Sequence, residues 1–196
     1  MDDILVSDGA SRDETIERAE ACGARVVRDG GGGKGVAIRR SRAELTGDVT
    51  VLIDADGSHD PEDIPKLVAP ILEGRADHVS GSRLLGGSSE LHGGFDEWAR
   101  LAGSSFITAC INRRYDVRLS DSQNGFRAIR TDVLQSLTLR SRHTTIEQEM
   151  LVATLRAGHR VTEVPTHEHR RKAGESHISV WRDGPSYVLS LARLMM

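Results

Sequence analysis

The sequence predicts an α/β domain with a mostly parallel central sheet flanked by helices. Short apolar segments of strand length alternate with segments of helical period along most of the 196 residues, which is the pattern of strands joined by crossover helices. Some of these apolar segments run straight into aspartates, as expected where the strands of an open α/β sheet meet a ligand. With 38% hydrophobic residues, the chain can bury the core of a single domain.

The first part of the chain alternates strictly between strands and helices. In order, we expect a strand at 4–6, a helix at 14–22, a strand at 25–27, a helix at 34–45, a strand at 49–53, a helix at 61–73 and a strand at 78–80. Asp60 is a suitable N-cap for the helix that begins at Pro61, because proline is favoured at the first helical position. The Gly- and Ser-rich stretch 84–94 predicts a flexible loop.

The remaining part predicts further helices and strands. We expect a helix at 96–114, a polar turn at 120–124, a strand at 125–129, a helix opened by Thr131, a helix at 146–157 and a strand at 160–164. The helix at 146–157 has Thr144 or Thr145 to cap its start and Gly158 to end it. The last segment, 180–196, mixes apolar residues with Arg182 and Arg193, which fits either a core helix or a membrane-surface helix.

The bulk composition excludes some classes of function. A net charge of -3 and a pI of about 6.2 lack the basic footprint of a nucleic-acid binder. Cys22 and Cys110 follow no metal-ligand spacing, so we expect a reducing, cytoplasmic environment with the membrane face as a candidate site of peripheral contact. The first strand begins at residue 4, so we expect the first βα unit of a nucleotide-binding sheet to be missing.

Two aspartates one residue apart follow the strand predicted at 49–53. Asp54 and Asp56 therefore stand just past the carboxyl end of a strand, where α/β sheets bind ligands. Carboxylates are hard oxygen ligands that suit Mg²⁺ or Mn²⁺ bridging the phosphates of a nucleotide. Because aspartates are also common in solvated turns, the spacing alone leaves a metal site and a capped turn as alternatives.

Two further segments have features of nucleotide binding. Asp8 ends the first strand, where its carboxylate could accept hydrogen bonds from a base or ribose. Ser11 and Asp13 after it are typical helix caps. Lys34 follows a run of glycines at the start of a helix, which would let the backbone approach a phosphate while the ammonium adds positive charge.

Taken together, these segments resemble the family 2 glycosyltransferases with the GT-A nucleotide-diphospho-sugar transferase fold, and within them the dolichyl-phosphate mannosyltransferase and polyprenyl-phosphate glycosyltransferase branch. The landmarks occur in the family's order over nearly the whole chain: 8–15, 33–35, 54–56, 59–61, 81–83, 121–127, Glu149, 163–165, and Arg171 with Gly174 and Ser176. The resemblance implies one domain over 1–196, with a nucleotide-sugar half at 1–83, an acceptor half at 84–177 and a C-terminal helix at 178–196.

The resemblance assigns roles to the donor side. Asp8 is similar to the aspartate that binds base and ribose, and Lys34 lies in the matching donor loop. Asp54 and Asp56 are similar to the aspartate pair that holds Mg²⁺ or Mn²⁺ on the diphosphate of a GDP- or UDP-sugar. Ser58 stands where a glutamine often completes the metal shell, so we expect water to replace that ligand.

The resemblance also assigns an acceptor side. Arg83 and Arg171 match arginines that contact the lipid phosphate or the donor phosphates, a task that suits the guanidinium; surface ion pairs are the alternative. Asp121 and Gln123 lie in the segment that lines the acceptor cleft. A hydroxyl acceptor would require Asp121 as general base. A phosphate monoester is already an anion near neutral pH, with a second pKa of about 6, and needs none.

The sequence as a whole therefore predicts a metal-dependent inverting glycosyltransferase that uses a polyprenyl phosphate acceptor, with Asp56, Asp121, Arg83 and Arg171 in the catalytic set. Three alternatives remain. One is a family 2 enzyme acting on a glycan or soluble acceptor. The second is a nucleotidyltransferase, which would release pyrophosphate. The third is an N-terminally truncated, inactive remnant that binds a nucleotide.

Overall fold

The computed structural model describes residues 3–89, 95–171 and 180–195. In chain order its elements are β1 (Leu5–Asp8), α1 (Thr15–Ala21), β2 (Arg25–Arg28), α2 (Lys34–Ser41), the 3₁₀ turn η1 (Arg42–Glu44), β3 (Val49–Leu52), the 3₁₀ turn η2 (Pro61–Asp63), α3 (Ile64–Leu72), β4 (His78–Ser82), α4 (Arg83–Gly86), α5 (Phe95–Tyr115), β5 (Arg127–Arg130), α6 (Thr131–Ser136), α7 (Ile146–Arg156), β6 (Val161–Pro165) and α8 (Val180–Met195). This succession confirms the predicted α/β class.

The strands form two sheets. β1 and β2 pair in parallel, and the larger sheet has the order β3-β5-β4-β6. β4 and β6 are parallel, whereas β5 runs antiparallel to both of its neighbours. This sheet is therefore mixed, and the predicted mostly parallel sheet is wrong in this respect, because the direction of β5 depends on pairing with strands that lie far away in the sequence. The reversal has a consequence for the site, because Arg127 at the start of β5 pairs with Leu52 at the end of β3 and with Ser80 near the end of β4. The segment before β5 therefore lies beside the segments after β3 and β4.

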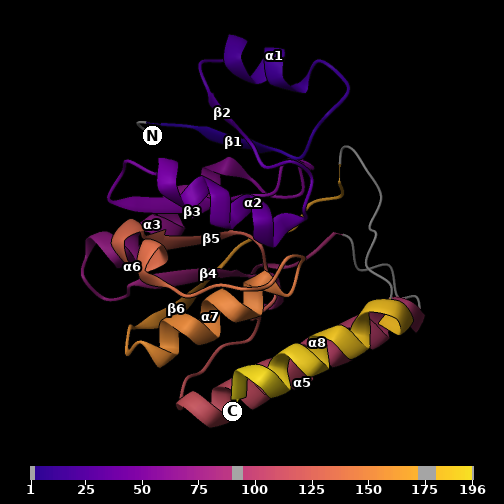
Figure 1. Ribbon diagram of the computed structural model, residues 1–196. Coiled ribbons are helices and arrows are strands. Elements are labelled where there is room, and N and C mark those ends of the chain that lie inside the picture. The colour runs from indigo at the N-terminus through magenta and orange to yellow at the C-terminus, as the bar shows by residue number, and fades with distance from the viewer. Residues whose placement is uncertain (1–2, 90–94, 172–179, 196) are drawn as a thin grey trace.

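The core lies on both faces of the larger sheet. Side chains alternate between the two faces of a strand, and along β5 Ala128 packs with Leu67 of α3, whereas Ile129 packs with Met150 of α7. All four of these residues are buried. Helix α3 thus covers one face and α7 the other, and the sheet is held between them (Figure 1).

Helices α5 and α8 lie side by side at one edge of the molecule (Figure 1). Ile111 of α5 and Leu191 of α8 are buried in a cluster with Leu151 of α7. This contact supports the core alternative for the C-terminal segment. Val188 and Leu189 of α8, in contrast, are exposed at 52% and 58%. None of the helices in the described ranges is long and apolar enough to cross a bilayer.

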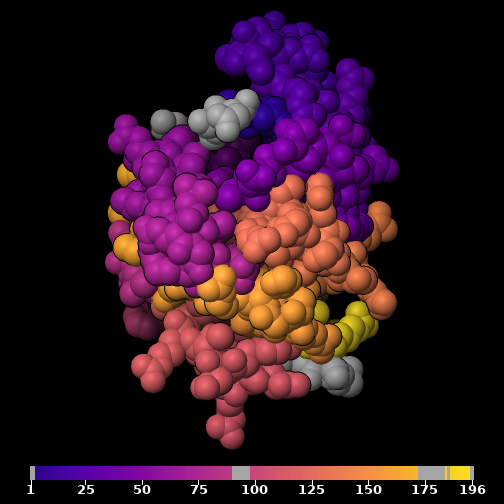
Figure 2. All heavy atoms as spheres, turned by 90° about the vertical axis from the view of Figure 1, so that its left-hand side faces the viewer, coloured from indigo at the N-terminus to yellow at the C-terminus, as the bar shows by residue number. Residues whose placement is uncertain are grey.

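Local details test the sequence predictions at single residues. Asp60 accepts a hydrogen bond from the amide of Glu62 at 2.9 Å, as predicted for an N-cap. Gly158, which follows α7, has a φ of 80°, the left-handed conformation that ends a helix. The loop predicted at 84–94 is wrong at its beginning, where α4 forms one helical turn because the hydroxyl of Ser82 accepts the amide of Leu85. Positions 90–94 of this prediction lie outside the described residues. The N-terminal elements protrude above the body of the molecule (Figure 2).

Candidate active site

The site forms where three segments meet at one end of the larger sheet. Asp54 and Asp56 follow β3, Arg83 follows β4, and the segment 121–125 leads into β5. The antiparallel pairing of β5 brings these segments together. The predicted donor residues after β3 and the predicted acceptor residues before β5 are therefore adjacent in the fold, although more than sixty residues separate Asp56 from Asp121 in the sequence.

Lys34 connects the glycine-rich segment to the aspartate pair. Its ammonium lies 2.5 Å from Oδ1 of Asp54 and 2.7 Å from Oε1 of Glu147. Burial disfavours the charged lysine, but the two carboxylates outweigh burial and raise the pKa of Lys34. A Cβ atom on Gly125 would lie 2.5 Å from Nζ of Lys34 and 2.7 Å from Oδ2 of Asp54. The absence of a side chain at position 125 therefore leaves room for this ion pair.

The second aspartate of the pair is held by its own turn and by Arg171. Oδ1 of Asp56 accepts the amide of Ser58 at 3.0 Å and its hydroxyl at 2.6 Å, while Nε of Arg171 lies 3.3 Å from Oδ2. Burial raises the pKa of Asp56, but the Ser58 hydrogen bonds and the charge of Arg171 produce a net lowering. Asp56 is thus an oriented carboxylate anion, and Ser58 orients it.

The aspartate pair fits a divalent cation of the predicted kind. Asp54 and Asp56 keep 37% and 21% of their side chains exposed, so a ligand can reach them. Within the described ranges no group of three or more His, Cys, Asp or Glu side chains could hold a metal ion. Mg²⁺ is usually held by one or two carboxylates together with substrate phosphates and water, so a two-carboxylate site suits an ion shared with a diphosphate.

Arg83 and Asp121 form a buried ion pair on the acceptor side. Asp121 accepts hydrogen bonds from Nε of Arg83 at 2.7 Å, from Nη2 at 3.1 Å, from the Arg83 amide at 3.3 Å and from the Gln123 amide at 3.1 Å. Burial raises the pKa of Asp121, but the charge and hydrogen bonds of Arg83 outweigh burial and lower it. Arg83 also contacts Glu168 at 3.3 Å. Both carboxylate oxygens of Asp121 are occupied, and the carboxyl is a weak base.

Asp8 lies at the edge of the N-terminal pair of strands. Its carboxylate accepts the amides of Ala10 at 3.0 Å and Ser11 at 3.1 Å, so it orders the turn after β1. The backbone of Gly9 lies against Gly31, where a Cβ would meet the Gly9 oxygen at 2.7 Å. Asp8 is therefore next to the glycine-rich segment, as expected for residues at the ends of paired parallel strands.

Three residues of the predicted site, or of the landmarks near it, already form hydrogen bonds within the protein. The amide of Gly35, at the start of α2, donates to the Arg142 carbonyl at 2.8 Å, so that amide is already used. The side chain of Gln123 donates to Ser122 Oγ at 2.9 Å. Glu149, one of the landmarks of the family resemblance, accepts the amides of Arg140 and Ser141 at 2.9 and 2.7 Å, so its carboxylate orders the loop before α7. The landmark residues Gly174 and Ser176 lie outside the described residues.

Sequence reasoning missed Glu147 and Glu168. Glu147 is buried in the first turn of α7 and reaches Lys34. Glu168 accepts from Arg83 and from the hydroxyl of Ser88 at 2.7 Å. Neither residue belongs to a motif, and their partners lie far away in the sequence. The only available signal for Glu147 was a charged residue beside the apolar positions of a predicted core helix.

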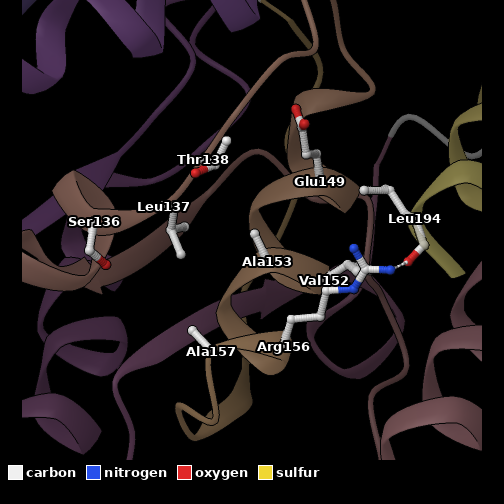
Figure 3. A pocket seen from close by; sticks show the side chains of 9 residues that line it. All are labelled: Ser136, Leu137, Thr138, Glu149, Val152, Ala153, Arg156, Ala157 and Leu194. Atoms are coloured by element: carbon white, nitrogen blue, oxygen red, sulfur yellow. Dashed lines mark hydrogen bonds between the residues drawn. The ribbon is translucent and has the colours of Figure 1, made fainter. Parts of the chain in front are cut away.

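A separate cavity of about 320 Å³ lies between α6, α7 and the end of α8. Ala153 and Arg156 of α7 line it, and Arg156 reaches across to donate to the Leu194 carbonyl at 2.5 Å (Figure 3). Of the sequence landmarks, only Glu149 contributes to its wall. The cavity is therefore distinct from the cluster around Asp54 and Asp56.

Comparison with known proteins identifies relatives over most of the chain. The family model described as glycosyl transferase family 2 matches residues 2–138. Glycosyltransferase AglJ of Haloferax volcanii is 32% identical over 97% of this chain, which spans 62% of that protein. The undecaprenyl-phosphate mannosyltransferase of Micrococcus luteus is 34% identical over 90% of this chain, which spans 76% of that protein.

The fold is also similar to that of a solved enzyme structure. Glucosyl-3-phosphoglycerate synthase from Mycobacterium tuberculosis, in complex with Mn²⁺ and UDP-glucose, is 25% identical and aligns with a TM-score of 0.73. The alignment covers 97% of this chain and 68% of that one. The GT-A-like arrangement expected from the sequence is thereby confirmed.

Proposed function

The chain belongs to glycosyl transferase family 2, and on that premise we propose that it transfers a hexose from a nucleoside diphosphate sugar to a polyprenyl phosphate, with inversion at the anomeric carbon. The donor in this proposal is a GDP- or UDP-sugar, and the ion is Mg²⁺ or Mn²⁺. Two lines support the donor class: the aspartate pair at the strand end, and the UDP-glucose and Mn²⁺ in the complex of the related synthase.

The state of Asp121 carries the choice of acceptor. A sugar hydroxyl must lose a proton to attack, so its enzyme needs a general base. Asp121, the residue in the position to supply one, has both oxygens occupied by Arg83 and by backbone amides and a lowered pKa. A phosphate monoester is already anionic near neutral pH. An acceptor that needs no base therefore fits this site better than a hydroxyl does.

The proposed reaction is a single in-line displacement. An oxygen of the acceptor phosphate forms a bond to the anomeric carbon as the bond from that carbon to the donor diphosphate breaks, and the nucleoside diphosphate leaves with the electron pair. Attack on the face opposite the leaving group inverts the configuration. Asp54 and Asp56 would hold the divalent cation, which neutralises the negative charge that develops on the leaving diphosphate.

The cations of the site have complementary tasks in this proposal. Lys34 lies between Asp54 and Glu147, from where its ammonium can bind the donor diphosphate as a point charge. Arg171, beside Asp56, presents a planar guanidinium suited to phosphate oxygens. Arg83 is anchored by Asp121 and by Glu168, and we assign it to the acceptor phosphate on the opposite side of the reacting carbon.

A polyprenyl acceptor also requires contact with a bilayer. We propose that the outer faces of α5 and α8 provide it, because Trp98, Phe106, Val188 and Leu189 on these helices are exposed large apolar residues. Arg193 in the last turn of α8 adds a basic group of the kind that favours anionic lipid. The buried face of α8 closes the core at the same time, so the helix combines both alternatives that the sequence left open.

The alternative is a family 2 enzyme with a soluble or glycan acceptor. The likeness to a synthase solved with phosphoglyceric acid, at 25% identity and a TM-score of 0.72, keeps this alternative open, although that acceptor also carries a phosphate. An extraction assay separates the two. Labelled nucleotide sugar is incubated with Mn²⁺ and either polyprenyl phosphate or soluble acceptors, and the lipid and aqueous phases are counted. Label that enters the lipid phase only with polyprenyl phosphate supports the proposal, and label transferred only to soluble acceptors contradicts it.

A further inference from the structure

Arg127 is a buried cation at the centre of the sheet. It lies on β5, is fully buried and is among the largest buried side chains. Within the described part of the chain no carboxylate forms an ion pair with it. Burial is the main cause that lowers the pKa of Arg127. A buried cation of this kind is costly unless its donors are satisfied, so the position of its partners is informative.

The guanidinium of Arg127 bonds to the backbone of two site segments. Nε donates to the carbonyl of Asn124 at 3.1 Å, and Nη2 donates to the same oxygen. Nη1 donates to the carbonyl of Glu147 at 3.0 Å. Arg127 thus joins the segment before β5 to the first turn of α7.

His78 and Thr154 support Arg127 from the other side. The hydroxyl of Thr154 donates to the carbonyl of Met150 at 2.8 Å, so it must accept from Nδ1–H of His78 at 3.1 Å. His78 is fully buried and next to Arg127, and both causes hold its pKa well below the ordinary value. The ring is therefore neutral, and its Nε2 is an acceptor that faces Nη1 of Arg127 at 3.5 Å.

The two segments that Arg127 joins enclose the Lys34 ion pair. Asn124 precedes Gly125, where an added Cβ would lie 2.5 Å from Nζ of Lys34 and 2.7 Å from Oδ2 of Asp54. Glu147 holds Lys34 through its carboxylate, while its own carbonyl is held by Arg127. Both segments that Arg127 joins therefore contact the Lys34–Asp54 ion pair.

We propose that Arg127 is a positioning residue for the transfer reaction. The nitrogens of its planar guanidinium form a fork of donors that fixes the segment at Asn124 relative to Glu147. Through these two segments, Arg127 fixes Lys34 against Asp54. The proposal rests on the proposed function, because Lys34 and Asp54 are its donor-binding residues. Arginine suits the task because its planar fork can bond to two backbone oxygens at once, whereas a lysine ammonium is a point charge on a flexible stem.

The test compares three variants of the full chain. Arg127→Met removes the fork at similar length, Arg127→Lys keeps the charge but loses the fork, and Thr154→Val breaks only the far end of the network. For each variant, calorimetry measures the affinity for UDP or GDP with Mn²⁺, steady-state assays give kcat and KM for the donor, and thermal unfolding gives Tm. Kinetic constants are normalised to the folded fraction.

Positioning and stability predict different patterns. If Arg127 positions the site, Arg127→Met loses about tenfold or more in kcat/KM, because small misplacements of reacting groups are costly. The kcat/KM of Arg127→Lys falls between those of Arg127→Met and the wild type. Thr154→Val lowers Tm but keeps near-native kinetics and nucleotide affinity. The proposal is wrong if folded Arg127→Met keeps native constants, or if Thr154→Val loses as much as Arg127→Met does. Should Arg127→Met not fold, Arg127→Lys against Thr154→Val decides in the same way.

A double-mutant cycle adds a measurement that distinguishes a positioning role of Arg127 from a merely structural one. Because Arg127 acts through Lys34, the effects of Lys34→Met and Arg127→Lys on nucleotide affinity are expected to be non-additive, whereas Lys34→Met and Thr154→Val add. Additive effects in both cycles overturn the proposal. The nucleotide-affinity arm needs no acceptor. A wild-type protein that binds nucleotide but transfers no sugar would count against the proposed function, and the affinities would still decide the role of Arg127.

Discussion

The guanidinium of Arg83 clamps the carboxylate of Asp121, with Nε at 2.7 Å and Nη2 at 3.1 Å from its two oxygens. In the proposed function this contact favours a phosphate acceptor over a hydroxyl, because it keeps Asp121 ionised and fully bonded. The pKa of Asp121 is lowered on folding. Its contribution to stability is therefore present above the ordinary aspartate pKa of about 3.9 and is lost as the pH falls through the lower, folded value.

The first prediction concerns the pH dependence of the rate. If the nucleophile is a phosphate dianion, the acid limb of kcat/KM follows the second pKa of the acceptor, about 6 for a phosphate monoester, because Asp121 titrates well below that range. A polyprenyl phosphonate, whose second pKa is higher, is expected to shift the limb upward. Rate profiles with the two acceptors measure this shift. If the acid limb stays at the same pH with both acceptors, it reports a group of the protein and not the acceptor phosphate, which would contradict this prediction.

The second prediction concerns the metal. Asp56→Ala is expected to abolish Mn²⁺- or Mg²⁺-dependent nucleotide binding while the fold remains intact, since it removes the oriented carboxylate of the pair. Asp60→Ala is the matched control, because the Asp60 side chain caps η2, and its loss is expected to cost about 1 kcal/mol of stability without affecting binding. Calorimetric titration of the nucleotide with and without the ion makes the comparison. Unchanged metal-dependent binding in Asp56→Ala would refute the assignment.

The third prediction concerns the room that Gly125 leaves. In Gly125→Ala the new methyl would overlap Nζ of Lys34 and Oδ2 of Asp54, so we expect weaker nucleotide binding and a loss of about tenfold or more in kcat/KM. In Gly103→Ala the methyl of the α5 residue meets open space, and stability is expected to rise by about 0.5–1 kcal/mol with unchanged kinetics. Equal kinetics for the two variants would contradict this prediction, because they would show that the side chains of Lys34 and Asp54 move aside without loss of function.

The fourth prediction separates the two faces of α8. Leu189 is exposed, so Leu189→Asp is expected to reduce co-sedimentation with anionic or polyprenyl-phosphate vesicles while Tm stays near native. Leu191 is buried, and Leu191→Ala is expected to cost about 2–5 kcal/mol of stability. A wild-type protein that never pellets with either vesicle would restrict α8 to the core.

The fold could be predicted from the sequence because its signals are local. The alternation of apolar strands and helical segments identified the α/β class, and Asp60 with Pro61 located the start of a helix. The direction of β5 could not be predicted, since it depends on pairing with β3 and β4, which lie far away in the sequence. The one-turn helix α4 was missed because its cap, Ser82, is part of a strand.

The site was predictable to the extent that it follows strand ends. Asp54, Asp56, Arg83 and Asp121 lie toward the same end of one sheet, because Asp54, Asp56 and Arg83 follow strands β3 and β4 and Asp121 lies in the segment before β5. The pairing partners were not predictable. Glu147 is two residues from Glu149 on α7, yet one reaches Lys34 and the other caps a loop, a difference that only the packing of the helix determines.

The turnover of Asp121→Asn with polyprenyl phosphate tests the central claim most directly. The asparagine can still accept a hydrogen bond from Arg83, so the fold is expected to survive with a loss of about 1–3 kcal/mol, which thermal unfolding measures. If the nucleophile is a phosphate, no proton is removed in the attacking step, and kcat is expected to fall by no more than about tenfold, well short of the range of general-base catalysis. A fall in kcat of about 10³-fold or more with donor and acceptor binding retained would show that Asp121 is a general base, and would contradict the account.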